Sequence, residues 1–248
     1  MKKDLMINNL FLLNLKDMEV PQGICKINDL VLVTCYRVNN KSCVIIYKDG
    51  IRVNEIILPN KSHVGGVAYY KKLDLIFISD SKGYVSSYNF SEFIKGDLKS
   101  RNRIKINDRA SSYLTVYKNK LYVGCFNKFK RGIVSVFDLE KNILKYEFTV
   151  PNKIQGVAFY NKGDSEYMLL SKSFGRKQNS KLLLYLYNKK KRRYIFSKKT
   201  IKLSPMLEQI TFDNNILMLL FESSSCMYRD TCSKVEDSVL TIDINKFI

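Results

Sequence analysis

Short apolar runs alternate with polar turns along almost the whole chain. The runs are rich in Val, Ile, Leu, Tyr and Phe, and Asn, Asp, Lys, Ser and Gly bound them. Residues 20–48, VPQGICKINDLVLVTCYRVNNKSCVIIYK, contain two such runs joined by a polar turn and preceded by Gln-Gly. No segment keeps a helical period for long, so the pattern predicts an all-β protein.

Five segments of the chain align with one another, and each begins with a triplet that opens a short predicted strand. After the triplet come a turn, a second and more apolar strand, a loop and a third strand. The triplets begin at Gln22, Gly65, Ser112, Gln155 and Glu208. The second strands are predicted at 30–36, 75–79, 121–126, 167–173 and 216–223, and the third at 43–48, 84–90, 133–139, 181–187 and 239–244.

Four of these units add a fourth, more polar strand, near 52–58, 102–107, 143–150 and 194–203. The fifth unit has none of its own, whereas the apolar segment 10–15, LFLLNL, precedes the first unit without a partner. A repeat of about 40–50 residues with four strands is the blade of a β-propeller. We predict a single five-bladed β-propeller domain over residues 1–248. The N-terminal strand should complete its last blade and so remove an exposed edge.

The pattern resembles that of five-bladed β-propellers over nearly the whole chain, without a signature such as a WD dipeptide. Three phrases, SKSFGR (171–176), SPMLEQI (204–210) and FESSSCMYRDTC (221–232), resemble motifs of uncharacterised bacterial propeller proteins. That resemblance implies no known activity.

Polar side chains gather on one predicted face of the propeller. The starts of the innermost strands and the loops between second and third strands share this face, which we call the upper face. Convergent polar groups at the mouth of a central channel favour a site for a small polar ligand or a polar segment of a protein partner. Alternatively, they hydrogen-bond backbone groups between blades or hold channel water. The ligand-binding candidates are Gln22, Tyr36, Arg37, His63, Gln155, Arg176, Glu208, Tyr228 and Arg229.

Three carboxylates on the upper face offer a catalytic alternative. Asp80, Glu208 and Glu222 are candidates for acid and base, or nucleophile, in a hydrolase such as a glycosidase. A glutamate beside Arg176 or Arg229 would instead form a fixed ion pair. The sequence leaves open whether the protein is an enzyme.

Metal and cofactor sites are not predicted. His63 is the only histidine, and one carboxylate among the five strand starts is a poor match for calcium. The six cysteines form no CxxC pair. Cys226 and Cys232 flank one loop and would form a disulfide in an oxidising compartment, while Cys25, Cys35, Cys43 and Cys125 are expected as buried thiols.

The formal net charge of +19 attracts phosphate backbones, anionic lipid and acidic partners. A coding bias that spreads Lys over solvated loops is the favoured explanation of this charge. The basic run 189–193, KKKRR, lies at a predicted hairpin tip on the opposite, lower face, which makes an anionic polymer or membrane surface a second alternative. Nucleic-acid binding needs exposed aromatic rings among the lysines, and only Tyr187 and Tyr194 flank the run, so it is not favoured.

No apolar stretch approaches the roughly 20 residues that span a bilayer, so no transmembrane segment is predicted. Residues 1–20 lack both an apolar signal core and a small-residue cleavage site. A cytoplasmic location is the default, and an extracellular one would require a signal upstream of this chain. We expect a monomer.

Overall fold

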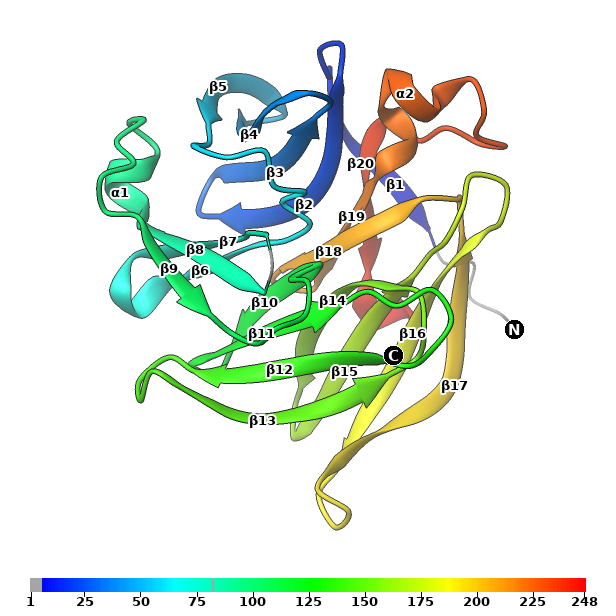
Figure 1. Ribbon diagram of the computed structural model, residues 1–248. Coiled ribbons are helices and arrows are strands. Elements are labelled where there is room, and N and C mark those ends of the chain that lie inside the picture. Colours follow the sequence, from blue (N-terminus) through cyan, green and yellow to red (C-terminus); the bar gives the residue numbers. More distant parts are fainter. Residues whose placement is uncertain (1–5, 82) are drawn as a thin grey trace.

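Five four-stranded antiparallel sheets form a ring in the computed structural model, which describes residues 6–81 and 83–248 (Figure 1). This arrangement confirms the five-bladed propeller. In the first four blades the strands follow chain order from the innermost to the outermost. The first blade comprises β2 (Glu19–Ile27), β3 (Leu30–Arg37), β4 (Asn40–Lys48) and β5 (Ile51–Ile57), and the second comprises β6 (Val67–Tyr70), β7 (Leu75–Ser79), β8 (Tyr84–Asn89) and β9 (Asn102–Lys105).

The other blades repeat the unit. The third comprises β10 (Tyr113–Tyr117), β11 (Lys120–Cys125), β12 (Gly132–Asp138) and β13 (Ile143–Val150). The fourth comprises β14 (Ile154–Lys162), β15 (Ser165–Lys172), β16 (Ser180–Asn188) and β17 (Arg193–Leu203). The fifth has β18 (Leu207–Asp213), β19 (Ile216–Phe221) and β20 (Ser238–Asp243), with β1 (Ile7–Leu12) outermost.

Helices are short, and all but the last lie between strands. They are α1 (Phe90–Phe93), α2 (Cys226–Arg229) and the 3₁₀ turns η1 (Lys71–Leu73), η2 (Glu222–Ser224) and η3 (Ile244–Lys246). In residues 6–81 and 83–248, no helix is long and apolar enough to cross a bilayer.

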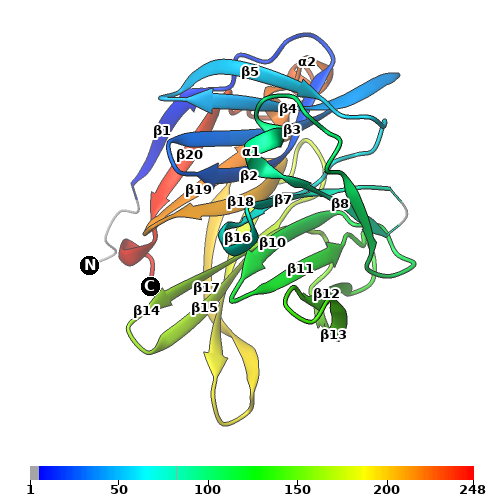
Figure 2. The same cartoon turned by 90° about the vertical axis from the view of Figure 1, so that its left-hand side faces the viewer.

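The N-terminal strand closes the ring. β1 pairs antiparallel with β20, from Ile7 opposite Ile242 to Leu12 opposite Ser238, and the two strands lie side by side in both side views (Figures 1 and 2). The strand begins three residues before the predicted 10–15 segment. It ends at Leu12, because the chain then turns into the core. Leu13 is buried, and its carbonyl accepts a 2.5 Å hydrogen bond from the Tyr47 hydroxyl.

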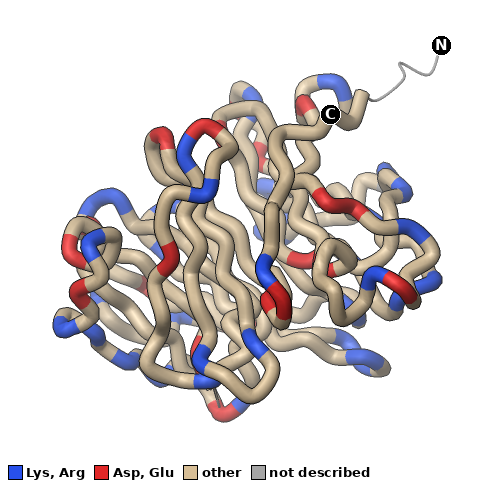
Figure 3. The backbone as a smooth tube through the Cα atoms, turned by 90° about the horizontal axis from the view of Figure 1, so that it is seen from above, with Lys and Arg blue, Asp and Glu red and all other residues tan. Residues whose placement is uncertain are grey.

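The core consists of apolar layers between neighbouring blades. Leu32 and Val44 of the first blade pack with Ile76 and Tyr88 of the second, and all four are at most 2% exposed. Alternate side chains of each strand point to opposite faces of its sheet, so each blade supplies two such layers. Lys and Arg lie mostly on the turns and loops around the ring (Figure 3).

Candidate functional site

Three of the five innermost strands carry a bulge where they enter the upper face. The pairing of β2 with β3 is interrupted between Pro21 and Gly23, and that of β14 with β15 between Ile154 and Gly156. The pairing of β18 with β19 is interrupted between Leu207 and Ile210. A bulge leaves its extra residue unpaired and re-aims the side chain. The bulged residues are Gln22, Gln155, Glu208 and Gln209.

Two of these residues bind carboxyl groups. The Nε2 of Gln155 donates to Oε1 of Glu208 at 2.9 Å, and the Nε2 of Gln22 donates to Oε1 of Glu222 at 2.8 Å. Glu208 is 4% exposed, and Glu222 follows β19 in η2. Within the described chain neither carboxyl forms a salt bridge. The channel mouth therefore holds two carboxyl groups whose hydrogen-bond partners are neutral amides.

Burial raises the pKa of both carboxyl groups. Desolvation raises the pKa of Glu222 to about 7, with small opposing effects from the Gln22 hydrogen bond and the Arg176 charge. Desolvation and the charge of Glu222 raise the pKa of Glu208 well above its usual value. The rise favours the protonated form of Glu208, while Glu222, with a pKa of about 7, is partly ionised at neutral pH.

Aromatic side chains lie beside the pair. The hydroxyls of Tyr36 and Tyr228 are 2.7 Å apart, and the Tyr36 ring stacks on the His63 imidazole with 4.6 Å between centroids. Burial raises the pKa of both tyrosines, and the charges of Glu222 and Glu208 add to the rise. His63 is solvent-accessible, and desolvation by the neighbouring protein atoms lowers its pKa.

Arg176 reaches the same region from the loop between β15 and β16. Its guanidinium carbon lies 4.7 Å from the centre of the Tyr228 ring, and its Nη1 donates to Oγ1 of Thr231 at 3.1 Å. The structure thus brings together seven of the nine predicted ligand-binding residues, together with Glu222. Those seven are Gln22, Tyr36, His63, Gln155, Arg176, Glu208 and Tyr228. Their role in binding stays a prediction.

The other two predicted binding residues lie elsewhere. Arg37 follows Tyr36 in β3, so its side chain points to the opposite face, where it binds Glu19 and Glu55. Arg229 follows Tyr228 in α2 and pairs with Asp237. Sequence reasoning grouped each arginine with its neighbour because both belong to an upper-face segment, and missed that adjacent side chains diverge.

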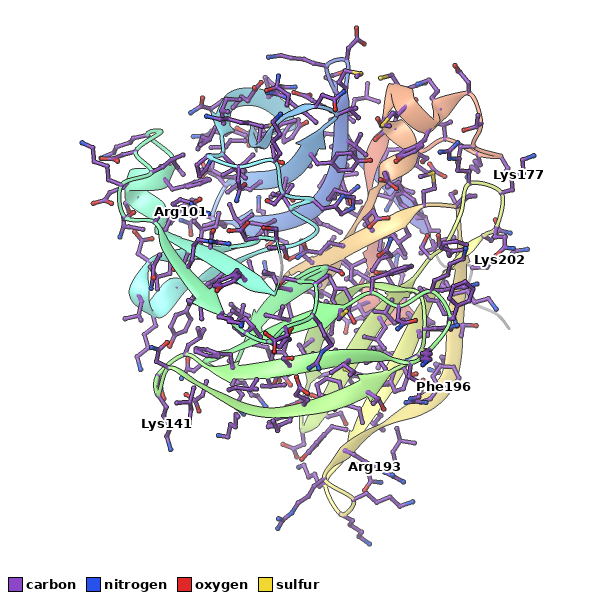
Figure 4. The ribbon with its side chains drawn as sticks, in the orientation of Figure 1. Arg101, Lys141, Lys177, Arg193, Phe196 and Lys202 are labelled. Carbon is purple, nitrogen blue, oxygen red and sulfur yellow. The ribbon has the colours of Figure 1, made fainter. Side chains whose placement is uncertain are left out.

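Asp80 is held in a separate ion-pair cluster. Its carboxylate binds Arg101 and Arg103, each at 2.9 Å, and also accepts from Asn60 and the Ser86 hydroxyl (Figure 4 labels Arg101). Burial raises the pKa of Asp80, but hydrogen bonds from the Ser81 N–H and the Ser86 hydroxyl and the charges of the two arginines outweigh it and hold that pKa below its usual value. Asp80 thus belongs to a fixed ion-pair cluster and, unlike Glu208 and Glu222, is bound by arginines.

Gln209 is a channel residue that sequence reasoning overlooked. Its side-chain amide accepts from the Val67 N–H at 2.9 Å and donates to the carbonyls of Val67 and Leu114. Three innermost strands are thereby bonded across the channel. The signal was present in the alignment of triplets, where Gln209 occupies the position at which three other triplets have glycine. The structure explains the glycines: a Cβ on Gly23 would lie 2.9 Å from the Gln209 amide oxygen, and one on Gly156 2.9 Å from the Gln209 Cα.

One cluster in the described chain has the donor types of a metal site. Atoms of Glu19, Cys43 and Glu55 lie within 4.8 Å of one another. However, Arg37 and Arg52 already bind both carboxylates, so the cluster is a buried ion-pair network. Charged arginines at the same oxygens would oppose a cation.

All six cysteines are free thiols in the structure. The Sγ of Cys232 lies 3.2 Å from the carbonyl oxygens of Arg176 and Lys234, while Cys226 is exposed at the start of α2. Cys25, Cys35 and Cys43 are buried as expected, and Cys125 is half-buried. A disulfide between Cys226 and Cys232 stays a prediction.

Comparison with protein-family models finds no match, and comparison with curated proteins finds none either. Solved structures do match. The chain is similar to Myxococcus xanthus glutaminyl cyclase, with a TM-score of 0.60, 8% identity and coverage of 95% of each chain. It is similar to the RRP9 WD40 repeats, with a TM-score of 0.54, 9% identity and coverage of 96% of this chain and 97% of that one.

A third similar structure is Kuenenia stuttgartiensis hydrazine synthase, with a TM-score of 0.52 and 12% identity. The match covers 82% of this chain and 56% of that chain, so it spans little more than half of the hydrazine synthase chain. At these identities the similarities establish the propeller fold and nothing finer.

Proposed function

We propose that the protein binds a small ligand bearing a protonated amine, or an amine-bearing segment of a partner, at the channel mouth. One observation carries the proposal: Glu208 and Glu222 are desolvated carboxyl groups that have amide partners but no salt bridge in the described chain. Buried carboxylates in proteins are usually paired with a cation. An ammonium group placed between them would supply that partner.

The surrounding side chains suit such a ligand. The Tyr36 and Tyr228 hydroxyls, which lie 2.7 Å apart, have oxygens that can accept hydrogen bonds from an ammonium group. Gln22 and Gln155 each donate a hydrogen bond to a carboxyl oxygen. The amide oxygen of each side chain can accept a hydrogen bond from a polar ligand. Arg176 at the rim would bind an anionic end of the same molecule.

A thermal-shift and calorimetric comparison of 1,4-diaminobutane with 1,4-butanediol tests this function. The two probes have similar size, and only the diamine is charged. The diamine should stabilise the protein and bind about tenfold more tightly at pH 8 than at pH 6, because Glu222 with a pKa of about 7 must be ionised.

The variant Glu222→Gln should lose the diamine response. Glu140→Gln is the matched control, because it removes the same charge from an exposed pair with Lys72. Equal effects of diamine and diol, or full diamine binding by Glu222→Gln, would contradict the proposal.

Hydrolysis by the same pair is the second candidate function. A protonated Glu208 would donate a proton to a leaving group while Glu222, with a pKa of about 7, acts as base or nucleophile at neutral pH. Chromogenic aryl glycosides assayed from pH 5 to 8 test it. Turnover that disappears in both Glu208→Gln and Glu222→Gln but persists in Glu140→Gln would support an enzyme.

A further inference from the structure

A continuous groove lies on the outside of the ring between the third and fourth blades. One part, of about 600 Å³, lies between β13 and the outer strands of the fourth blade. A second part, of about 540 Å³, extends to the upper-face loop between β15 and β16. Both are lined by Pro151, Tyr185 and Phe196, so they join. The residues that line them include none of those described above at the channel mouth.

The groove continues the apolar layer between the two blades outward. Near the channel the layer is closed, and Tyr113 and Val157 of the innermost strands are each 0% exposed. Farther out, Phe148 and Tyr185 are only partly buried against it, and Tyr146 and Phe196 are 45% and 40% exposed. Aromatic faces that would be covered in a closed layer are therefore open to solvent.

Seven aromatic residues line the two parts. The Tyr185 and Phe196 rings lie 5.3 Å apart, and Tyr146 and Phe148 face the groove from β13 with 6.4 Å between their rings. The full set is Tyr146, Phe148, Phe174, Tyr185, Tyr187, Tyr194 and Phe196. Sequence reasoning considered only the two tyrosines that flank the basic run. Tyr185 and Phe196 lie two residues farther along the same strands, and the other three rings come from the third blade or from the loop between β15 and β16.

The charged residues that line the groove are all basic. They are Arg131, Lys153, Lys172, Lys181, Arg192 and Arg193, and no described Asp or Glu lines either part. Figure 4 shows Arg193 and Phe196 along β17. Desolvation and the charges of Lys153 and Lys181 lower the pKa of Lys172, which reflects a cationic cluster without local counter-charge.

We propose that this groove binds single-stranded nucleic acid, with bases stacked on its aromatic rings and phosphates bound by its arginines and lysines. Rows of aromatic rings within a positively charged groove are the features by which proteins hold single strands without sequence preference. In a duplex the base faces are already stacked on one another, so the rings favour a single strand. RNA and DNA both carry charged phosphates and aromatic base faces, so we expect the groove to bind single strands of either kind.

The site is independent of the amine-binding function proposed for the channel mouth. Its residues come from β13, β15, β16, β17 and nearby loops, whereas the carboxyl pair comes from β18 and η2. Glu222→Gln should therefore leave strand binding unchanged.

Fluorescence anisotropy with labelled twelve-nucleotide oligo(U) and oligo(dT), and with a duplex of the same length, tests the proposal on the full chain. Single strands should bind at least tenfold more tightly than the duplex. The double variant Tyr146→Leu, Phe196→Leu keeps apolar bulk but removes two ring faces, and it should weaken binding about tenfold or more. Because both side chains are exposed, a thermal melt should match that of the parent.

Two comparisons separate stacking from general charge attraction. Tyr84→Leu is the matched control, since Tyr84 has Arg103 over its ring at 4.3 Å but lies in the second blade; it should bind like the parent. Arg131→Ala with Arg193→Ala should reduce the slope of log affinity against log salt by about 1.4, or about 0.7 for each lost phosphate contact. The proposal is overturned if Tyr146→Leu, Phe196→Leu binds within twofold of the parent, or if duplex or heparin binds as tightly as the single strands.

Discussion

Gln22 donates a 2.8 Å hydrogen bond to Glu222, a residue 200 positions later in the chain. The bond connects the innermost strand of the first blade to the turn after β19 in the last. The candidate site is thus assembled across the junction where the ring closes. Its carboxyl pair depends on the same burial that the closed ring provides.

The raised pKa values of the carboxyl pair predict a pH-dependent stability. A carboxyl with a folded pKa above its unfolded value of 4.5 destabilises the fold progressively as pH rises through that interval. For Glu222, with a folded pKa of about 7, the loss between pH 4.5 and 7 is about 3 kcal/mol. Urea unfolding at pH 5, 6, 7 and 8 measures it.

The variant Glu208→Gln, Glu222→Gln separates this effect from other titrations. His63 acts in the opposite direction, because a lowered folded pKa makes stability rise as pH increases toward 6.5. The double variant should lose the fall in stability and exceed the parent at pH 8. Parallel pH profiles for parent and variant would contradict the assignment.

Gln209 should be essential for stability although it lies in the channel. Gln209→Ala leaves the Val67 N–H and the Leu114 carbonyl without their side-chain partner, at about 1–3 kcal/mol for each buried group. Chemical denaturation should show a loss of about 3 kcal/mol. Gln178→Ala, at an exposed position, is the control and should change stability by less than about 0.5 kcal/mol. Equal stabilities of the two variants would refute the role of the amide.

Closure of the ring predicts very different losses of stability for substitutions at two adjacent leucines. Leu13 is 1% exposed, so Leu13→Ala should cost about 2–5 kcal/mol, whereas Leu12 is 55% exposed and Leu12→Ala should be nearly neutral. Deletion of residues 1–18 should abolish the cooperative transition, because it removes β1 and exposes the edge of β20. A truncated chain that keeps that transition and the far-UV spectrum would show that closure is dispensable.

The buried network of the first blade predicts a large cost for losing one arginine. Glu19 is fully buried, and one of its carboxylate oxygens lies 2.8 Å from Nη1 of Arg52. Desolvation raises the pKa of Glu19, but hydrogen bonds from Arg52 and Arg37 outweigh it and lower that pKa. Arg52→Met should destabilise the protein by about 3–5 kcal/mol, because it removes a partner from a buried charge. Lys105→Met breaks an exposed pair with Asp108 and should cost about 0.5 kcal/mol or less. Similar costs, measured by urea unfolding, would argue against a structural role for the network.

Periodicity predicted the blades because each strand carries its own alternation of buried and exposed residues. It also placed Gln22, Gln155 and Glu208 together, since equivalent repeat positions converge at the axis. It could not separate Tyr36 from Arg37, because it ended the strand at Tyr36, whereas β3 includes Arg37 and alternation directs the two side chains to opposite faces. Nor could it find the groove, whose aromatic residues come from different blades.

The most direct test of the carboxyl-pair account is a ¹³C NMR titration of the Glu208 and Glu222 side chains from pH 4 to 9. The free protein should show Glu222 titrating near pH 7 and Glu208 above its usual range. A saturating concentration of 1,4-diaminobutane, which stays charged over this range, should lower both values. Titration of both carboxyls below pH 5 in the free protein, or pKa values that the diamine leaves unchanged, would contradict the account.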